Sequence, residues 1–175
     1  MNRKIIGFAM ACVLGAGAAA VVWAAEDEKI ELDKAPVAVQ AAVKKAVGDG
    51  KLAALIKESE DGKTVYEAEF AIGDKDHSVK IAESGEVLEE EAEVALDALP
   101  AAVLAGVKTK YADGKVEDAT MVKAGGKTSY ELTVKVGETE HDLIVDASGA
   151  IGDDKVEAEH EGDEKDENGE KKDKD

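Results

Sequence analysis

One phrase of this chain is written twice, and the repetition constrains the fold more than any other feature. "GKTVYEAEF" begins at Gly62, and "GKTSYELTV" begins at Gly126, which is 64 positions later. The same offset superimposes the two prolines and two of the histidines without a gap. Self-similarity at a fixed period indicates a tandem duplication. We therefore place one repeat at residues 32–90 and a second at residues 96–152.

Each repeat begins with a segment of helical character. Residues 35–47 read "APVAVQAAVKKAV" and carry Val39 and Val43 at helical spacing. Residues 99–111 read "LPAAVLAGVKTKY" and repeat this spacing. Both segments have a proline in the first turn, where its missing N–H costs no hydrogen bond. The two segments predict one amphipathic helix at the start of each repeat.

Strand patterns follow each helical segment. In residues 63–72, Tyr66 and Phe70 alternate with Glu67 and Glu69, and residues 128–136 alternate in the same way. Such period-two patterning predicts a sheet that is solvated on one face. The expected fold class is α+β, with two tandem repeats that each have one helix and a three- to four-stranded antiparallel meander. A unit of about 60 residues is marginal alone, so we expect the copies to pack together or to share one sheet.

The N-terminal segment has the pattern of a secretory signal peptide, which we place at residues 1–24. Arg3 and Lys4 precede an apolar run, and cleavage is expected after Ala24. A retained membrane anchor is the alternative, because the run approaches the length of about 20 residues that spans a bilayer. Cleavage would remove Cys12, the one cysteine, and leave no disulfide or thiolate. The expected location is the periplasm or the cell exterior, without membrane contact after cleavage.

Charge limits the partners of the chain. It has 40 acidic and 22 basic residues, for a formal net charge of -18. So negative a surface repels phosphate backbones, so we expect no nucleic acid partner. Residues 153–175 are almost entirely polar and predict a disordered acidic tail. The field would attract basic protein patches and, weakly, divalent cations, although it could serve solubility alone.

Each repeat resembles the PepSY-like domain, a family related to the β-lactamase-inhibitor-like fold. The resemblance rests on the two helical segments, on "YEAEF" and "YELTV", and on the closing "VKIAESGEVL" and "LIVDASGAI". Asp146 fits the acidic position of the family's closing turn, whereas Ala82 departs from it. The resemblance implies an α+β fold in exported proteins that bind or inhibit other proteins, peptidases among them. It supplies no catalytic residues.

The sequence offers a binding surface more readily than a catalytic site. The candidates are Tyr66, Glu67, Glu69, Tyr130 and Glu131, which occupy the repeated strand. The tyrosines could anchor a partner on an open sheet face. The apolar residues on their side of the strand favour a second interpretation, in which they pack beneath the helix. No serine lies in a nucleophile elbow, and no pair of carboxylates is singled out for acid–base work.

His77 and His141 are the weak candidates for metal binding. They occupy equivalent strand positions beside acidic residues, but neither has the second histidine that usually anchors zinc. We expect no cofactor. The expected function is that of an exported, non-enzymatic protein-binding module, including an inhibitor of a peptidase or another envelope protein. The alternative is an acidic envelope protein that binds divalent cations with low affinity.

Overall fold

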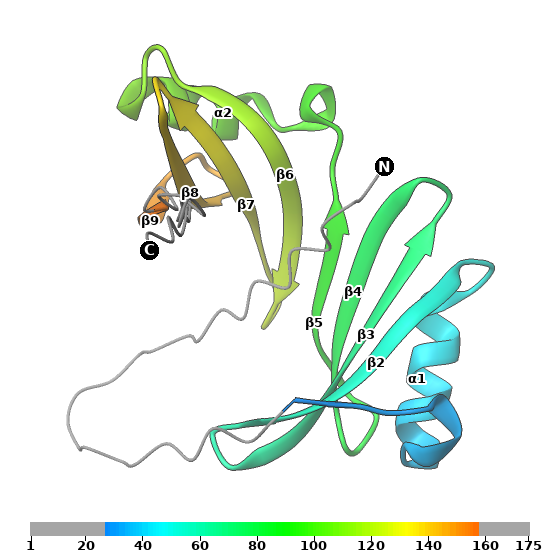
Figure 1. Cartoon of the computed structure of the whole chain (residues 1–175). Helices are drawn as coiled ribbons and strands as arrows, with labels where there is room; N and C mark the ends of the chain where they lie inside the picture. Colours follow the sequence, from blue (N-terminus) through cyan, green and yellow to red (C-terminus); the bar gives the residue numbers. More distant parts are fainter. Residues whose placement is uncertain (1–26, 158–175) are drawn as a thin grey trace, which may run out of the picture.

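The computed structural model describes residues 27–157, whose strands form one sheet. All neighbours are antiparallel, and the strands lie in the order of the chain (Figure 1). They are β1 (Glu28–Lys29), β2 (Lys51–Glu60), β3 (Lys63–Ile72), β4 (Lys75–Ala82), β5 (Val87–Glu93), β6 (Lys115–Ala124), β7 (Lys127–Val136), β8 (Thr139–Asp146) and β9 (Ile151–Glu157). The helices α1 (Val37–Val47) and α2 (Ala101–Lys110) follow short 3₁₀ turns at Leu32–Lys34 and Leu96–Ala98.

The expected α+β class, with two tandem repeats of one helix and a three- to four-stranded meander, is wrong, because a single, mainly β sheet of nine strands runs through the described residues. β5 pairs with β6 from Glu89 opposite Ala124 to Glu93 opposite Thr120. Side-chain alternation shows which face of a strand is apolar, but it does not show which outer strands pair with each other. If they were apart, β5 and β6 would each present an unpaired edge, so their pairing satisfies both rows of backbone groups.

Tight turns connect the strands that the repeated phrase predicts. Asp61 and Gly62 have φ of 50° and 75° between β2 and β3. Gly125 and Gly126 have φ of 57° and 74° between β6 and β7. Two consecutive residues with positive φ form the turn whose twist matches that of the flanking strands. These glycines, with Asp61, therefore fix the register of the two long hairpins.

Irregularities in the sheet recur at the same 64-residue spacing. The register shifts between Leu52 and Ala54 in β2, and between Val116 and Asp118 in β6. Further shifts lie at Lys80/Ile81 and at Ile144/Val145. An extra residue bends a strand and increases its twist, so both parts of the sheet curve in the same way. The duplication that would explain this recurrence stays a prediction from the sequence.

Two separate cores lie between the sheet and the helices. Val39 and Val43 of α1 are 0% and 1% exposed, and Val103 and Val107 of α2 are 0% and 1% exposed. The first core adds Leu55, Tyr66, Ala68, Phe70, Val79 and Ile81, and the second adds Ala119, Tyr130, Leu132, Val134, Leu143 and Val145. Complete burial of one such aliphatic side chain stabilises the fold by about 1.5–3 kcal/mol. The helical and strand spacings of the sequence are confirmed in these positions.

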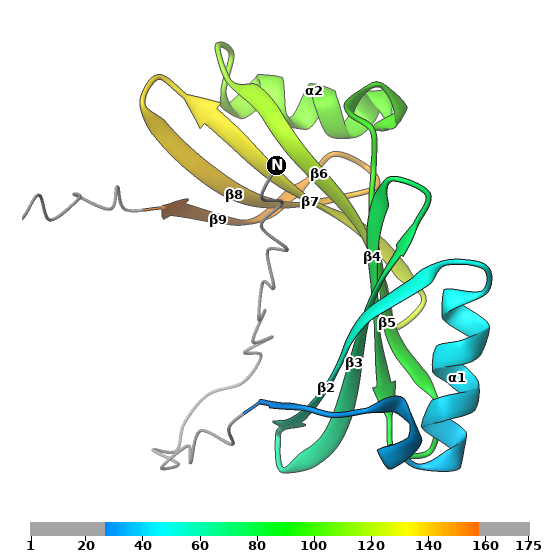
Figure 2. The same cartoon turned by 45° about the vertical axis from the view of Figure 1, so that its right-hand side comes forward.

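The sheet bends strongly between its two parts, and both helices lie on the outside of the bend (Figure 2). Register places Ala92 opposite Met121 on the helix side, and Glu91 opposite Val122 on the other side. The inner side of the bend therefore carries neither of the helices of residues 27–157. It is one continuous face that crosses from β2 to β9.

Two expectations concern the ends of the chain. The predicted signal peptide at residues 1–24 lies outside the described residues. The predicted disordered tail begins too early at residue 153, because β9 continues to Glu157 and pairs with β8. The remainder of that tail, residues 158–175, also lies outside the described residues. Over residues 27–157, neither helix combines the length and the apolar character that crossing a bilayer requires.

Candidate interaction surface

The face of the sheet without a helix, which we call the concave face, is lined by acidic side chains. Alternation along each strand sends these side chains away from the cores. Its charged residues include Glu58 of β2, Glu67 and Glu69 of β3, Asp76 and Lys80 of β4, Glu89, Glu91 and Glu93 of β5, Asp118 of β6, Glu131 and Lys135 of β7, Glu140 and Asp142 of β8, and Asp153 and Lys155 of β9. Carboxylates from eight strands, β2 to β9, thus share one surface.

A hollow of about 220 Å³ lies on this face and is lined by residues of five strands, β5 to β9. Glu91, Glu131 and Asp142 line it from β5, β7 and β8. Ile144 and Thr120, which register places on either side of Glu131, also line it. The bend of the sheet brings strands that are not neighbours into one concavity. The hollow therefore combines an apolar patch with half-buried negative charges.

Glu131 has a strongly perturbed pKa in the hollow. Burial is the main cause that raises its pKa from 4.5 to about 7, and the charges of Glu91 and Glu89 raise it further. Asp142 acts in the same direction, and Lys155 opposes it. A carboxylate that lies in a low-dielectric site near like charges is costly to ionise. The ionised hollow therefore carries a negative charge that Lys155 offsets only in part.

Other carboxylates of the concave face respond in the same direction. Burial raises the pKa of Glu91, although the Ser78 hydroxyl donates a hydrogen bond of 3.0 Å to its carboxylate and opposes the shift. Burial, with a hydrogen bond to Glu67, raises the pKa of Glu58 to about 7. Burial also raises the pKa of Glu69. The perturbation therefore extends along the concave face.

The cations of this face already have acidic partners. Lys80 Nζ lies 2.7 Å from Glu60 Oε1, and Lys155 Nζ lies 3.7 Å from Asp153 Oδ2. Lys135 Nζ lies 3.8 Å from Glu140 Oε1. Lys80 lowers the pKa of Glu91 and Lys155 lowers that of Glu131, but burial and nearby carboxylates outweigh both lysines. Opposite charge from outside would favour their ionised forms. The arrangement can thus attract and hold a cationic group.

The structure separates the five predicted surface residues into two groups. Tyr66 and Tyr130 are 4% and 9% exposed and belong to the two cores, as the apolar side of their strands favours. Glu67, Glu69 and Glu131 lie together on the concave face. A partner on that face would meet the glutamates and not the tyrosines. The interaction role of these glutamates stays a prediction.

The two candidate histidines have different surroundings. The His77 ring stacks on Phe70, with centroids 5.5 Å apart. His141 Nδ1 lies 3.0 Å from Asp154 Oδ1 and 2.9 Å from the Tyr111 hydroxyl. Among residues 27–157, no group of three or more His, Cys, Asp or Glu side chains is arranged to hold a metal ion. Among the described residues, neither histidine therefore belongs to a metal-binding arrangement.

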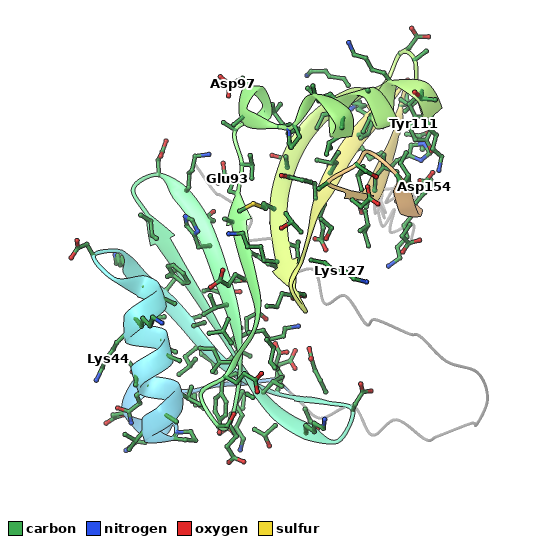
Figure 3. The ribbon with its side chains drawn as sticks, turned by 180° about the vertical axis from the view of Figure 1, so that it is seen from behind. Lys44, Glu93, Asp97, Tyr111, Lys127 and Asp154 are labelled. Atoms are coloured by element: carbon green, nitrogen blue, oxygen red, sulfur yellow. The ribbon has the colours of Figure 1, made fainter. Side chains whose placement is uncertain are left out.

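Asp154 joins β9 to the end of α2. Its carboxylate accepts a hydrogen bond of 2.6 Å from the Tyr111 hydroxyl (Figure 3). It also forms an ion pair with Lys110. We call Lys110, Tyr111, His141 and Asp154 the Asp154 cluster. Burial alone would raise the pKa of Asp154, but the hydrogen bonds from Lys110, Tyr111 and His141 outweigh it and lower the pKa to about 2. The same bond to Asp154 raises the pKa of Tyr111 to about 12.

Sequence reasoning missed Glu58, Glu91 and Asp142 as members of the surface. Glu91 lies in the run "LEEEAE", where charges at successive positions hide the alternation of a strand. Asp142 does alternate with an apolar neighbour, Leu143, which is in the second core, whereas Glu58 lies between Lys57 and Ser59. For Asp142, the pattern predicts the solvated face. It does not show that the bend gathers Asp142 and Glu91 around one hollow.

Comparison with known proteins gives structural neighbours. No family model matches the sequence, and no curated protein is similar enough to count as a relative. A protein from Bacteroides eggerthii that is predicted to be periplasmic matches with a TM-score of 0.58 and 23% identity, over 70% of this chain and 88% of the other. A DUF2874 family protein from Bacteroides uniformis matches with a TM-score of 0.58 and 23% identity, over 70% and 89%.

A third neighbour is a BLIP-like protein from Bacteroides fragilis, with a TM-score of 0.54 and 23% identity, over 70% of this chain and 86% of the other. At these identities the likeness concerns the fold. The chain thus shares its fold with DUF2874 and BLIP-like proteins. The broader part of the resemblance inferred from the sequence, to the β-lactamase-inhibitor-like fold, is supported by this match.

Proposed function

We propose that the chain is an exported, non-enzymatic module that binds another protein through the concave face. The observation that carries the proposal is that helices cover one face of the sheet, while the opposite face is bent inward, hollowed and acidic. A concavity with convergent polar groups is a typical recognition site. The glutamates that the sequence suggested for binding, Glu67, Glu69 and Glu131, lie on this face.

Export is supported by two independent observations. The N-terminal pattern is that of a signal peptide. The neighbour from Bacteroides eggerthii is described with a periplasmic location, and it shares the fold. The periplasm or the cell exterior is therefore the compartment in which the partner is to be sought.

The concave carboxylates are assigned to recognition and not to acid–base catalysis. An acid and a base working together need environments that push their pKa values apart. The environments of Glu91 and Glu131 raise both pKa values, and burial is the main cause in each. Because both pKa values shift in the same direction, the carboxylates suit a surface that binds a cation of another molecule.

A finer proposal follows from the resemblance of each repeat to the PepSY-like domain. The chain would be a tandem PepSY-like protein, and its partner would be a peptidase or another envelope protein that it inhibits. The recurring bulges and the BLIP-like fold of a structural neighbour support this placement. Inhibition would arise because a convex partner surface that enters the concavity is no longer accessible.

Site-specific photo-crosslinking tests the proposed binding face without changing its charge. A photoreactive phenylalanine analogue would replace Ser129 or Thr133 on the concave face, and Lys45 or Lys108 on the helices as matched controls. The protein is expressed in its native host, and the crosslinked adducts are identified in the envelope fraction. We expect one discrete protein adduct from the concave positions only. Equal adducts from the helix positions, or none from the concave ones, would refute the proposal.

A further inference from the structure

Among residues 27–157, no helix packs on the concave face, whereas both helices cover the other face of the same sheet. A one-sided antiparallel sheet commonly presents its polar face to water. This face differs because the bend hollows it and half buries carboxylates that water would otherwise solvate. These features are those of a binding surface, and its charges determine which chemical groups can bind there.

The charges around the hollow are predominantly negative, and each strand that borders it contributes at least one carboxylate. They are Glu89 and Glu91 on β5, Glu117 and Asp118 on β6, Glu131 on β7, Glu140 and Asp142 on β8, and Asp153 with Lys155 on β9. Lys155 lies 3.7 Å from Asp153. A complementary occupant must bring positive charge.

Glu91 and Glu131 are placed to act on one group. They extend from β5 and β7, which are two strand spacings apart, or about 10 Å. Register places Glu93 in line with Glu131, and Glu91 two residues further along β5. Both residues line the hollow, and the charge of Glu91 raises the pKa of Glu131. Ile144 lies beside Glu131 and gives the hollow an apolar wall. The hollow of about 220 Å³ admits a side chain but not a folded element.

We propose that the partner of the concave face presents an arginine, whose guanidinium lies between the carboxylates of Glu91 and Glu131 and whose aliphatic stem packs against Ile144. This inference rests on the proposed function. A guanidinium offers five donors in a planar fork and can bridge two carboxylates, whereas an ammonium acts as a point charge. The guanidinium is also less strongly hydrated, which suits a partly desolvated hollow.

The proposal fixes the pH dependence of binding. The occupant binds the ionised carboxylates, so binding releases the protons that Glu131 and Glu91 carry when their pKa values are raised. Affinity is therefore expected to increase as pH rises from 6 to 8. Screening of the acidic field makes it fall with added salt.

The test uses the secreted chain, residues 25–175, labelled with ¹⁵N. The blocked peptide Gly-Arg-Gly is titrated beside Gly-Lys-Gly and Gly-citrulline-Gly, and amide shifts are followed at pH 6 and pH 8. We expect the arginine peptide to shift amides of β5–β8 around the hollow. The lysine peptide should bind more weakly, and the neutral citrulline peptide should not bind.

Two double variants separate the hollow from the general acidity. Glu91→Gln with Glu131→Gln should weaken arginine binding by at least about tenfold. Glu90→Gln with Glu138→Gln removes the same charge from exposed positions outside the hollow, and should retain binding. Unchanged spectra elsewhere confirm that each variant is folded. Equal losses in both variants, or shifts scattered over the acidic surface, would overturn the inference.

Two further outcomes would overturn the inference specifically. Tighter binding of calcium chloride alone at the same amides would make the hollow a cation site. If the Glu91→Gln, Glu131→Gln variant still crosslinks to the partner as strongly as the native protein, the proposed function would stand. The inference that an arginine of the partner binds between these carboxylates would be refuted. Failure of the proposed function itself would instead appear as crosslinks from the helix positions.

Discussion

The two parts of the sheet have the same framework but fix their closing strands differently. In the first part, β5 follows the β4–β5 turn and is held between β4 and β6. In the second part, β9 pairs only with β8 among the described strands. The Asp154 cluster ties β9 to α2, whereas the positions 64 residues earlier hold Ala46, Val47, His77 and Glu90. A strand with one neighbour thus has a polar anchor that a strand with two neighbours lacks.

The two helices also differ in how closely they approach the turn before the closing strand. A Cβ added to Gly106 of α2 would lie 2.0 Å from the Gly149 carbonyl oxygen. The corresponding residue of α1 is Ala42, which already has a Cβ. The absence of that methyl group lets α2 approach the β8–β9 turn closely. The same backbone arrangement can therefore be closed by ordinary apolar packing or by a close approach combined with a polar anchor.

The largest expected effect comes from filling this close approach. Gly106→Ala should lower the free energy of unfolding by about 2–3 kcal/mol, since the methyl group would meet backbone. This loss would occur although alanine favours a helix by about 1 kcal/mol over glycine. Urea unfolding at pH 7 measures it. In α1, Ala42→Gly should cost only about 1 kcal/mol. A stabilised Gly106→Ala protein would show that α2 does not sit so close.

The next effect concerns the hollow. The pKa of Glu131 is raised in the folded protein, so folding takes up protons between about pH 4.5 and 7, and stability falls as pH rises through that window. Glu131→Gln should therefore stabilise the protein at pH 8 by about 1–2 kcal/mol, after allowance for solvent screening. The gain should vanish near pH 4. Glu138→Gln, in an exposed turn, is the control, and an equal gain from it would contradict the prediction.

Removal of a single oxygen atom should weaken the Asp154 cluster, which is the polar anchor of β9. Tyr111→Phe removes the hydroxyl that bonds Asp154 and lies 2.9 Å from His141 Nδ1. We expect a loss of about 1–2 kcal/mol, and faster hydrogen exchange in β9 than in β5. Tyr66→Phe is the matched control in the first core, since no described residue hydrogen-bonds its hydroxyl. Unchanged exchange in β9 would refute the anchor.

The smallest effect is confined to acid. The lowered pKa of Asp154 means that its stabilising contribution is present above about pH 4 and is lost as pH falls through about 2. The melting temperature of the native protein should therefore decline more between pH 4 and pH 2 than that of Asp154→Asn. Glu90→Gln, at the corresponding position of β5, serves as the comparison. Parallel declines in all three proteins would remove Asp154 from this role.

The local structure was largely predictable from the sequence, but its assembly was not. Alternation around Tyr66 and Tyr130 predicted the central strands and their apolar faces, and the valine spacing predicted both helices. The pairing of β5 with β6 carries no local signal, because "LEEEAE" resembles a charge run. β9 was missed because its residues are mostly polar, and its anchor lies on an element some 40 residues earlier. The hollow depends on the bend and so could not be read from any one strand.

The strand order has a consequence for how the molecule is made. Every strand pairs with the strand that comes next in the chain, so no pairing waits for a distant segment. Short sequence separations reduce the loop-closure entropy that usually slows the folding of β proteins. The sheet can therefore grow from its N-terminal edge as the polypeptide emerges from a ribosome or a membrane pore. Each new strand covers the edge left by the one before it, and β9 completes the row.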